Sequence, residues 1–348
     1  MAYTNIDDPS AHFQAKGYAG NSVDNTAITN DGNSDLQPDL IWFARYDTPA
    51  DKFLLNSSTG VTKFLISSGT SAEGTSTSLL KSFDTNGFSV GTNSNTNSSS
   101  SNYVAWQWKA NGGTTSSNTD GSVTSTVQVN QDAGFSIVTY TVGIAGGNHS
   151  VGHGLGVAPD FIVIKCRGTA QDWLVYHSSL GSGNYIKLNT TAGSVAYADS
   201  FGDGVTSSVF GYNYAGTTIA NQPYIAYCFA EKQGYSKFGS YVGNGNDNGP
   251  FIYTGFKPAF VLTKGTNASQ WRLYDSARSP NNVNINRLFP YTNSAEATDT
   301  DAGIDMLSNG FKIRGSGGDY NASGTTYIYM AFADNPLVTS TGIPTTAR

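Results

Sequence analysis

Apolar and polar residues follow one another along this chain in short blocks. Runs of about five to eight apolar residues are separated by turns rich in Gly, Asn and Ser, and several runs show the period of two that is typical of strands. A helical period of 3.6 is not convincing anywhere, and residues 294–307 are the one place where we expect a short helix. The pattern predicts a protein of many strands and loops.

One aromatic phrase occurs three times, each time at a similar distance from a run that begins with Pro. The distance from that Pro to the first Tyr of the phrase is 65, 65 and 69 residues. A recurring distance of this kind is typical of internal repeats. The three pairs are PDLIWFAR (from Pro38) with YVAWQWKA (from Tyr103), PDFIVIKC (from Pro159) with YIAYCFAE (from Tyr224), and PAFVLTKG (from Pro258) with YIYMAFAD (from Tyr327).

Three further landmarks recur between the two members of each pair. An aromatic-led run follows 13 to 15 residues after the Pro, then comes a second apolar run, and then a short run with a Phe 50 to 53 residues after the Pro. Five landmarks in one order predict an internal triplication of a module of about 100 residues. The landmarks are FLLNSS, KFLISS and GFSVG in the first copy, WLVYHSS, YIKLNT and VFGYN in the second, and WRLYDSA, NRLFPYT and GFKIR in the third.

The repeated phrase is apolar at odd and even positions alike, so we expect both faces of this strand to be buried. Doubly buried strands with alternating partners suit two sheets packed face to face. We therefore predict an all-β fold of three tandem β-sandwich modules, with which a jelly-roll connection is compatible.

The landmarks and the composition also predict the module boundaries. We expect a divergent first module at 1–110, a flexible Gly/Ser/Thr-rich linker at 111–134, a second module at 135–231, a third at 232–336 and an irregular tail at 337–348. Because the second and third modules adjoin directly, we expect them to form one rigid body, with the first module more loosely tethered.

Composition and charge narrow the classes of function. Only 13% of the residues are charged, against about a quarter in a typical soluble domain, and the net charge is −6. Lys and Arg are scattered without a basic stripe, so we expect no nucleic-acid partner. The first ten residues lack the basic and apolar regions of a secretory signal, and no apolar run reaches the roughly 20 residues of a membrane span, so we expect no membrane insertion.

Two cysteines lie inside apolar runs. We expect Cys166 and Cys228 to be small buried hydrophobic residues rather than a disulfide pair, since nothing in the chain points to an oxidising compartment.

Two polar segments carry candidate metal ligands. Asp299, Asp301 and Asp305 in TDTDAGID suggest a calcium loop, although the position where an EF-hand needs its last carboxylate is Gly310. His149 and His153 have the spacing of zinc ligands on a helix, but the surrounding glycines favour a turn that leads into the next strand. Calcium is therefore the one cofactor that stays a candidate.

Catalytic motifs do not stand out, so we predict a protein without enzymatic activity. A glycosidase would need a pair of carboxylates, and no pair stands out. Asp172 and Asp275 lie near equivalent positions of the second and third copies beside aromatic residues, where a sugar-stacking platform and plain strand ends are both compatible with them. Aromatic residues in the repeated strands are expected in the core. Those in loops, Tyr212, Tyr214 and Tyr320, are the candidates for surface contacts with a ligand.

The second and third copies resemble a module that recurs in predicted virion and tail-fibre proteins of marine bacteriophages, including cyanophages. The resemblance covers about residues 135–336, and the first copy lacks the phrases SKFGSY and YDSARSP. It implies a structural or adhesion protein and supplies no catalytic residues. The phrases that carry it are HGLGVAPDFIVIKCR, DWLVYHSSLG, YIAYCFAEKQGYSKFGSYVGNGNDNGPFIYTGFKPAFVLTK, YDSARSP, LSNGFKI and NASGTTYIYMAFADNP.

We therefore expect a virion protein of the tail-fibre or receptor-binding type, made in the host bacterial cytoplasm without a signal peptide. Its expected partners are other virion proteins and a glycan of the host surface, and a homotrimer is favoured because fibres commonly assemble through the edges of such modules. Two alternatives stay open: a capsid decoration or other structural virion protein, and a polysaccharide-degrading tailspike enzyme.

Overall fold

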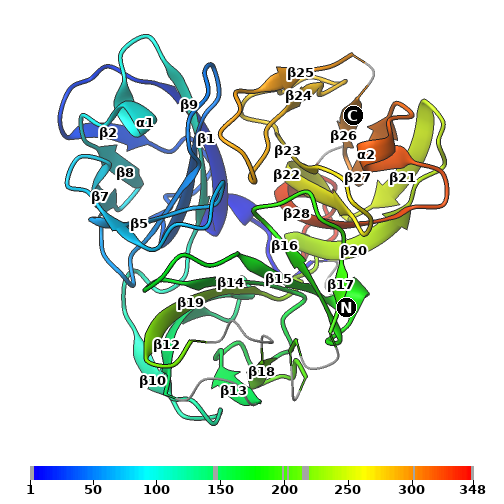
Figure 1. Ribbon diagram of the computed structural model, residues 1–348. Coiled ribbons are helices and arrows are strands. Elements are labelled where there is room, and N and C mark those ends of the chain that lie inside the picture. The colour runs from blue at the N-terminus through cyan, green and yellow to red at the C-terminus, as the bar shows by residue number, and fades with distance from the viewer. Residues whose placement is uncertain are drawn as a thin grey trace.

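The computed structural model describes residues 4–143, 148–197, 200–201, 204–213, 219–300 and 302–345, and the statements below concern these residues. The described chain is nearly all-β and consists of several separate antiparallel sheets, which confirms the predicted fold class. Three groups of strands surround a common centre (Figure 1). They correspond to the first, second and third modules that the repeats predict.

Each module contains one large sheet and one small outer sheet, and the third has a further two-stranded sheet. The elements of the first module are η1 (Pro9–Ala11), β1 (Phe13–Ala19), β2 (Thr26–Thr29), β3 (Leu40–Arg45), β4 (Phe53–Asn56), β5 (Lys63–Ile66), β6 (Gly74–Thr75), β7 (Leu80–Asp84), β8 (Gly87–Val90), α1 (Ser94–Asn97) and β9 (Asn102–Trp108). Those of the second are β10 (Ser116–Asn118), β11 (Ser125–Asn130), β12 (Phe135–Val142), β13 (His149–Gly152), β14 (Phe161–Cys166), β15 (Leu174–His177), η2 (Ser178–Leu180), β16 (Asn184–Lys187), β17 (Val195–Ala196), β18 (Val209–Tyr212) and β19 (Gln222–Phe229). Those of the third are β20 (Ser236–Val242), β21 (Asn248–Tyr253), β22 (Phe256–Gly265), β23 (Trp271–Asp275), β24 (Asn286–Arg287), β25 (Ala297–Thr298), β26 (Gly303–Leu307), β27 (Gly310–Arg314), α2 (Gly318–Asn321) and β28 (Thr326–Pro336).

The same strand order recurs in the three large sheets. It runs β1-β9-β3-β4 in the first module, β12-β19-β14-β15 in the second and β20-β28-β22-β23 in the third. In each sheet the repeated aromatic phrase is one central strand and the Pro-led run is its neighbour. This recurrence is what an internal triplication would produce, and the triplication itself stays a prediction.

Strands that carry the aromatic phrase are buried on both faces, as the sequence predicted. In β19, Tyr224, Ala226 and Cys228 pack into the core between the two sheets of the second module. Ile225 and Tyr227, on the opposite face, pack into a core that all three modules share. The strand therefore belongs to two cores at once.

The shared core lies at the centre of the molecule, and aromatic rings from all three modules meet there. The ring of Phe332 lies 5.1 Å from Phe13, 5.5 Å from Trp108, 5.8 Å from Phe229 and 6.1 Å from Phe260, measured between ring centroids. Each such pair adds about 0.5–1.5 kcal/mol beyond the burial of its area. The inner faces of the large sheets are therefore buried against one another and are not accessible to a partner.

Residues 111–134 are not the flexible linker that we predicted. They contain β10 and β11, which extend the large sheet of the second module through pairing with β12. The low complexity of this segment hid a strand-like alternation in STVQVN, where Val127 is buried. This segment is therefore a packed strand and not a linker. The first module is also not loosely tethered, because it shares its core with the other two.

The short helix expected at 294–307 is also wrong, because this segment contains β25 and β26. Ile304 and Met306 alternate with Asp305, and this period of two places both apolar side chains in the core of the third module. The described helices are single turns, and α1 and α2 each precede a strand with the aromatic phrase.

Candidate functional site

Neighbouring modules are joined by the same two backbone hydrogen bonds at all three interfaces. Between the second and first modules, Gln171 N–H donates to Thr70 O (2.8 Å) and Glu73 N–H donates to Arg167 O (2.9 Å). The corresponding pairs are Ser269 N to Thr191 O (2.9 Å) and Ser194 N to Thr266 O (2.8 Å) between the third and second modules, and Ala50 N to Asn293 O (2.7 Å) and Glu296 N to Tyr46 O (2.9 Å) between the first and third. The contacts are head-to-tail and close into a ring.

A buried lysine accompanies each pair of backbone bonds. Lys165 Nζ donates to Thr70 O at 2.7 Å, Lys264 Nζ to Thr191 O at 3.4 Å, and Lys52 Nζ to Ser294 O at 2.9 Å. All three side chains also donate to carbonyl groups of their own module. The ammonium groups therefore bridge the modules through carbonyl groups, and no carboxylate of the described residues forms an ion pair with them.

The first module reaches this arrangement from a different position. Lys165 and Lys264 lie six residues after the module's Pro, whereas the first module has Ala44 there. Lys52 lies at the position of Trp173, fourteen residues after the Pro. The interface between the first and third modules therefore also contains a buried ammonium group, but the lysine that supplies it lies at a different position of the module.

Burial lowers the pKa of Lys52, Lys165 and Lys264, in each case to about 8. The lysine side chains are no more than 1% exposed, and a low-dielectric environment disfavours the charged form. Carbonyl dipoles offset part of that cost because they accept from the ammonium protons. A lysine with such a pKa in an active site would invite a catalytic interpretation, but here it lies between packed modules.

Two of the interfaces also contain ion pairs. Arg167 and Glu73 form a fork with N–O distances of 2.6 and 3.0 Å between the second and first modules. Arg278 bonds Asp275 at 2.7 Å and also Glu296, and Trp106 of the first module donates its indole N–H to the same Asp275 at 3.2 Å. The partly buried Arg167–Glu73 pair therefore joins two modules directly. The ion pairs of Arg278 lie within the third module, and the bond from Trp106 to Asp275 ties them to the first module.

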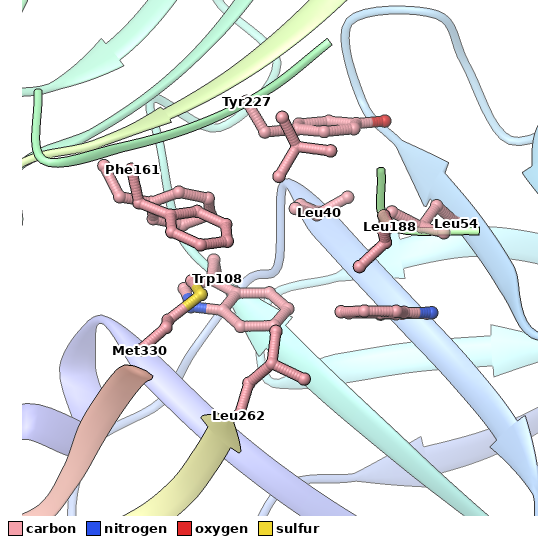
Figure 2. Close-up of a pocket in the computed structure, with 11 residues that line it drawn as sticks. Leu40, Leu54, Trp108, Phe161, Leu188, Tyr227, Leu262 and Met330 are labelled. Carbon is pink, nitrogen blue, oxygen red and sulfur yellow. The ribbon is translucent and has the colours of Figure 1, made fainter. Parts of the chain in front are cut away.

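The shared core contains a cavity of about 30 Å³ to which all three modules contribute side chains (Figure 2). It is far smaller than the several hundred Å³ of a typical ligand pocket. Aromatic and aliphatic groups line it, so we read it as a packing gap. The lining residues are Leu40, Trp42, Leu54, Trp108, Phe161, Val163, Leu188, Tyr227, Phe229, Leu262 and Met330.

The two described candidates for calcium ligands, Asp299 and Asp305, each pair with an arginine. Asp299 pairs with Arg287 at 3.3 Å, Asp305 is buried and pairs with Arg314 at 2.5 Å, and Asp301 lies outside the described residues. Within the ranges given above, no group of three or more His, Cys, Asp or Glu side chains could hold a metal ion. The described aspartates thus serve as partners of arginines.

His149 and His153 do not lie on a helix face. His149 begins strand β13, not the turn that we expected, and His153 follows the strand as a buried residue. The Nδ1 atom of His153 accepts from Leu155 N–H (3.2 Å), so its Nε2–H donates to Thr206 O (3.1 Å). Burial lowers the pKa of His153, and this neutral tautomer is fully used within the fold.

Two of the three tyrosines predicted as surface contacts are buried. Tyr212 is 3% exposed in the core of the second module. Tyr320 is 1% exposed, with the Arg272 guanidinium 4.2 Å above its ring. Tyr214 lies outside the described residues. Tyr212 ends strand β18 and Tyr320 belongs to α2, so neither lies in the loop that the sequence suggested.

The two aspartates noted beside aromatic residues, Asp172 and Asp275, are engaged in ion pairs. Asp172 bonds Lys187 at 2.6 Å, and Asp275 is fully buried against Arg278. Their aromatic neighbours Trp173 and Tyr274 are buried as well. Cys166 and Cys228 are buried and free, as predicted.

Exposed aromatic rings gather instead on the outer sheet of the third module. Phe251 and Tyr253 of β21 are 45% and 59% exposed, while Ile252 between them points into the module's core. β21 is an edge strand in the order β21-β27-β26. A signal in the sequence could have shown this, since Pro250 in GPFIYTGF is typical of an edge strand and the rings alternate with Ile252.

No described helix is both long and apolar enough to pass through a membrane. Searches of the curated proteins and of the solved structures found no match to the chain. The sequence profile of the family described as "Domain of unknown function (DUF7483)" matches residues 8–336 and so spans all three modules in one match. The chain belongs to this family.

Proposed function

We propose that the protein is a structural component of a bacteriophage particle, of the tail-fibre or receptor-binding type, whose outer sheets contact the surface of the host cell. The observation that carries this proposal is the closed ring. Its inner faces are buried in a shared core, so the outward-facing sheets and their loops are the surfaces left for partners. Support also comes from the resemblance of residues 135–336 to phage virion modules.

A binding role fits the chemistry better than a catalytic one. Lysines with lowered pKa values are used between modules, and the candidate carboxylates Asp172 and Asp275 are held by Lys187 and Arg278. A glycosidase needs one free acid and one free base flanking the same bond. Release of reducing sugar from host lipopolysaccharide, above that of a heat-killed control, would contradict the binding role.

Immunogold labelling of purified particles tests the location. Antibodies raised against the full chain should label the tail of the phage that encodes it. Label confined to the capsid shell would replace the fibre assignment with a decoration protein, and particles without label would overturn a virion role altogether.

The homotrimer predicted from the sequence is part of the proposal and needs its own test. The three modules of one chain already contact one another in a closed ring, so the trimer that we propose would use surfaces outside that ring. Size-exclusion chromatography with light scattering measures this directly. A mass of three chains supports the trimer, and a single chain at high concentration contradicts it.

A further inference from the structure

We propose that Phe251 and Tyr253 form a platform that binds a saccharide through ring stacking. This inference rests on the proposed function and names the site and ligand class for it. The two rings project from the same face of β21, because Ile252 between them points inward. Residues two apart on a strand are rooted about 7 Å from each other, so the pair presents a continuous aromatic strip.

Glycines beside the rings shape this strip. A Cβ atom at Gly310, which pairs with Tyr253, would collide with the carbonyl oxygen of Ile252 at 2.1 Å and would lie 3.1 Å from the ring carbon Cε2 of Phe251. A Cβ atom at Gly255 would lie 3.6 Å from Tyr253 Oη. The edge of the Phe251 ring therefore lies against the bare backbone at Gly310, and the Tyr253 hydroxyl lies beside Gly255. Rings held in place before binding lose little conformational freedom when a ligand arrives.

Polar groups lie on the same face of the outer sheet. Lys312 is the cross-strand partner of Phe251, and its Nζ donates to Gly249 O at 2.6 Å. Arg314 is 41% exposed and forms a two-bond ion pair with Asp305 of β26. Rings for stacking, together with the cationic donors Lys312 and Arg314 for hydroxyl groups, suit a sugar, because a sugar ring has an apolar face and a polar rim.

The size of the strip favours a small ligand over a protein. Two half-exposed rings offer apolar area on the order of 200 Å², whereas a stable protein interface buries about 800 Å² on each partner. The charge of the face argues against single-stranded nucleic acid. Lys312 and Arg314 face one carboxylate, that of Asp305, which leaves one excess positive charge where a nucleic-acid groove carries a row of them.

The strip is a feature of the third module. Its counterparts in the outer sheets of the first and second modules, β2 with sequence TAIT and β13 with sequence HSVG, contain no Phe, Tyr or Trp. Phe251 and Tyr253 also lie in GPFIYTGF, which is part of one of the phrases that carry the resemblance to phage virion modules.

The test uses the full chain on an array of O-antigen and capsular oligosaccharides from bacteria. The wild type should bind at least one saccharide, and Phe251→Ala and Tyr253→Ala should each weaken that binding about tenfold, since ring stacking is the contact removed. Val23→Ala removes an apolar side chain that is 59% exposed in the first module and should leave binding unchanged. Thermal unfolding of the variants should match the wild type because both rings are exposed.

Two leucine variants separate ring stacking from general apolar contact. Phe251→Leu and Tyr253→Leu keep apolar area but lose the ring, so they should bind as weakly as the alanine variants. Equal binding of leucine variants and wild type would overturn the stacking platform, as would an array without any bound saccharide. Label on phage tails combined with no saccharide binding would remove this inference and leave the virion role standing. Saccharide binding combined with phage particles that carry no label would remove the virion role and leave the saccharide platform standing.

Discussion

Lys165 of the second module donates a hydrogen bond from its buried ammonium group to the carbonyl oxygen of Thr70 in the first module, at 2.7 Å. Lys264 and Lys52 do the same at the other two interfaces. A buried cation is costly even where carbonyl groups accept its protons, and Lys264 also donates to the Ser269 hydroxyl. The burial lowers the pKa of each lysine to about 8. The three modules are therefore joined by contacts whose strength depends on pH.

Stability should rise between pH 8 and pH 9. In this window the folded lysines lose their protons, while the unfolded lysines, with a pKa near 10.5, keep theirs, so the unfolded state binds more protons and unfolding becomes less favourable. Each lysine should contribute about 1 kcal/mol over this pH unit. Urea unfolding at both pH values measures the rise.

Lys165→Met is the matched variant for that measurement. It should lose about a third of the rise, and Lys187→Met, which removes a partly exposed lysine, should keep all of it. Above pH 9 the raised pKa values of Cys228 and the buried tyrosines act in the opposite direction, so the comparison between variants is the decisive one. A rise of equal size in Lys165→Met and wild type would contradict the lysine assignment.

Acid should destabilise the protein through His177. Its Nδ1 accepts from Ser179 N–H (3.1 Å), so its Nε2–H donates across the module boundary to Tyr329 O (3.0 Å). Burial lowers the pKa of His177 to about 4, so between pH 6.5 and pH 4 the unfolded state takes up a proton that the folded state refuses. The loss should reach about 3 kcal/mol at pH 4.

The variant His177→Gln tests this pH dependence. It should be less stable than the wild type at pH 7, because a packed ring and its hydrogen bonds are altered. The difference between the two proteins should shrink as the pH falls from 6.5 to 4. A constant difference across this range would show that His177 does not titrate as described.

Asp39 should be one of the most sensitive positions of the first module. Its carboxylate is fully buried and accepts from the backbone N–H groups of Ala110, Gly112 and Gly113 and from the hydroxyl of Ser57. Asp39→Ala should destabilise the protein by about 3 kcal/mol, because several donors to one charged group lose their acceptor. Asp120→Ala, at an exposed aspartate, should change stability by no more than about 0.5 kcal/mol.

Limited proteolysis gives a second measurement of the same contact. Residues 110–113 should become cleavable in Asp39→Ala and stay protected in the wild type and in Asp120→Ala. Rapid cleavage of the wild type there would support the flexible linker that the sequence predicted.

The second and third modules should not fold normally without the first. A chain of residues 111–348 would expose apolar side chains of the shared core, among them Phe135, Phe161 and Phe229. We expect this fragment to aggregate or to bind a hydrophobic dye. A soluble fragment with the stability of the full chain would show that the first module is indeed loosely attached.

Much of the fold was predictable because each module repeats its strongest patterns. The doubly apolar phrase at Tyr224 predicted a strand buried on both faces, and β19 is such a strand. Its second face is covered by other modules, however, and a pattern along one chain segment does not say which distant segment packs against it. For this reason the shared core and the ring could not be predicted.

The candidate site was harder to predict because a side chain outside the repeated strands can point to solvent or into the core, and the sequence pattern does not say which. Tyr320 looked like a surface residue, yet its ring lies under Arg272, a contact between residues far apart in sequence. The lysines left a clearer signal. A Lys recurs six residues after the Pro in FIVIKC and FVLTKG, inside otherwise apolar runs, and a charge repeated there indicates a buried partner.

Calorimetric unfolding of the full chain tests most directly whether three modules form one body around a shared core. The rings that meet at Phe332 couple every module to the other two, so we predict a single transition whose calorimetric and van't Hoff enthalpies agree. Phe332→Ala should lower the temperature of that one transition without splitting it. Two or more separate transitions in the wild type would contradict the shared core.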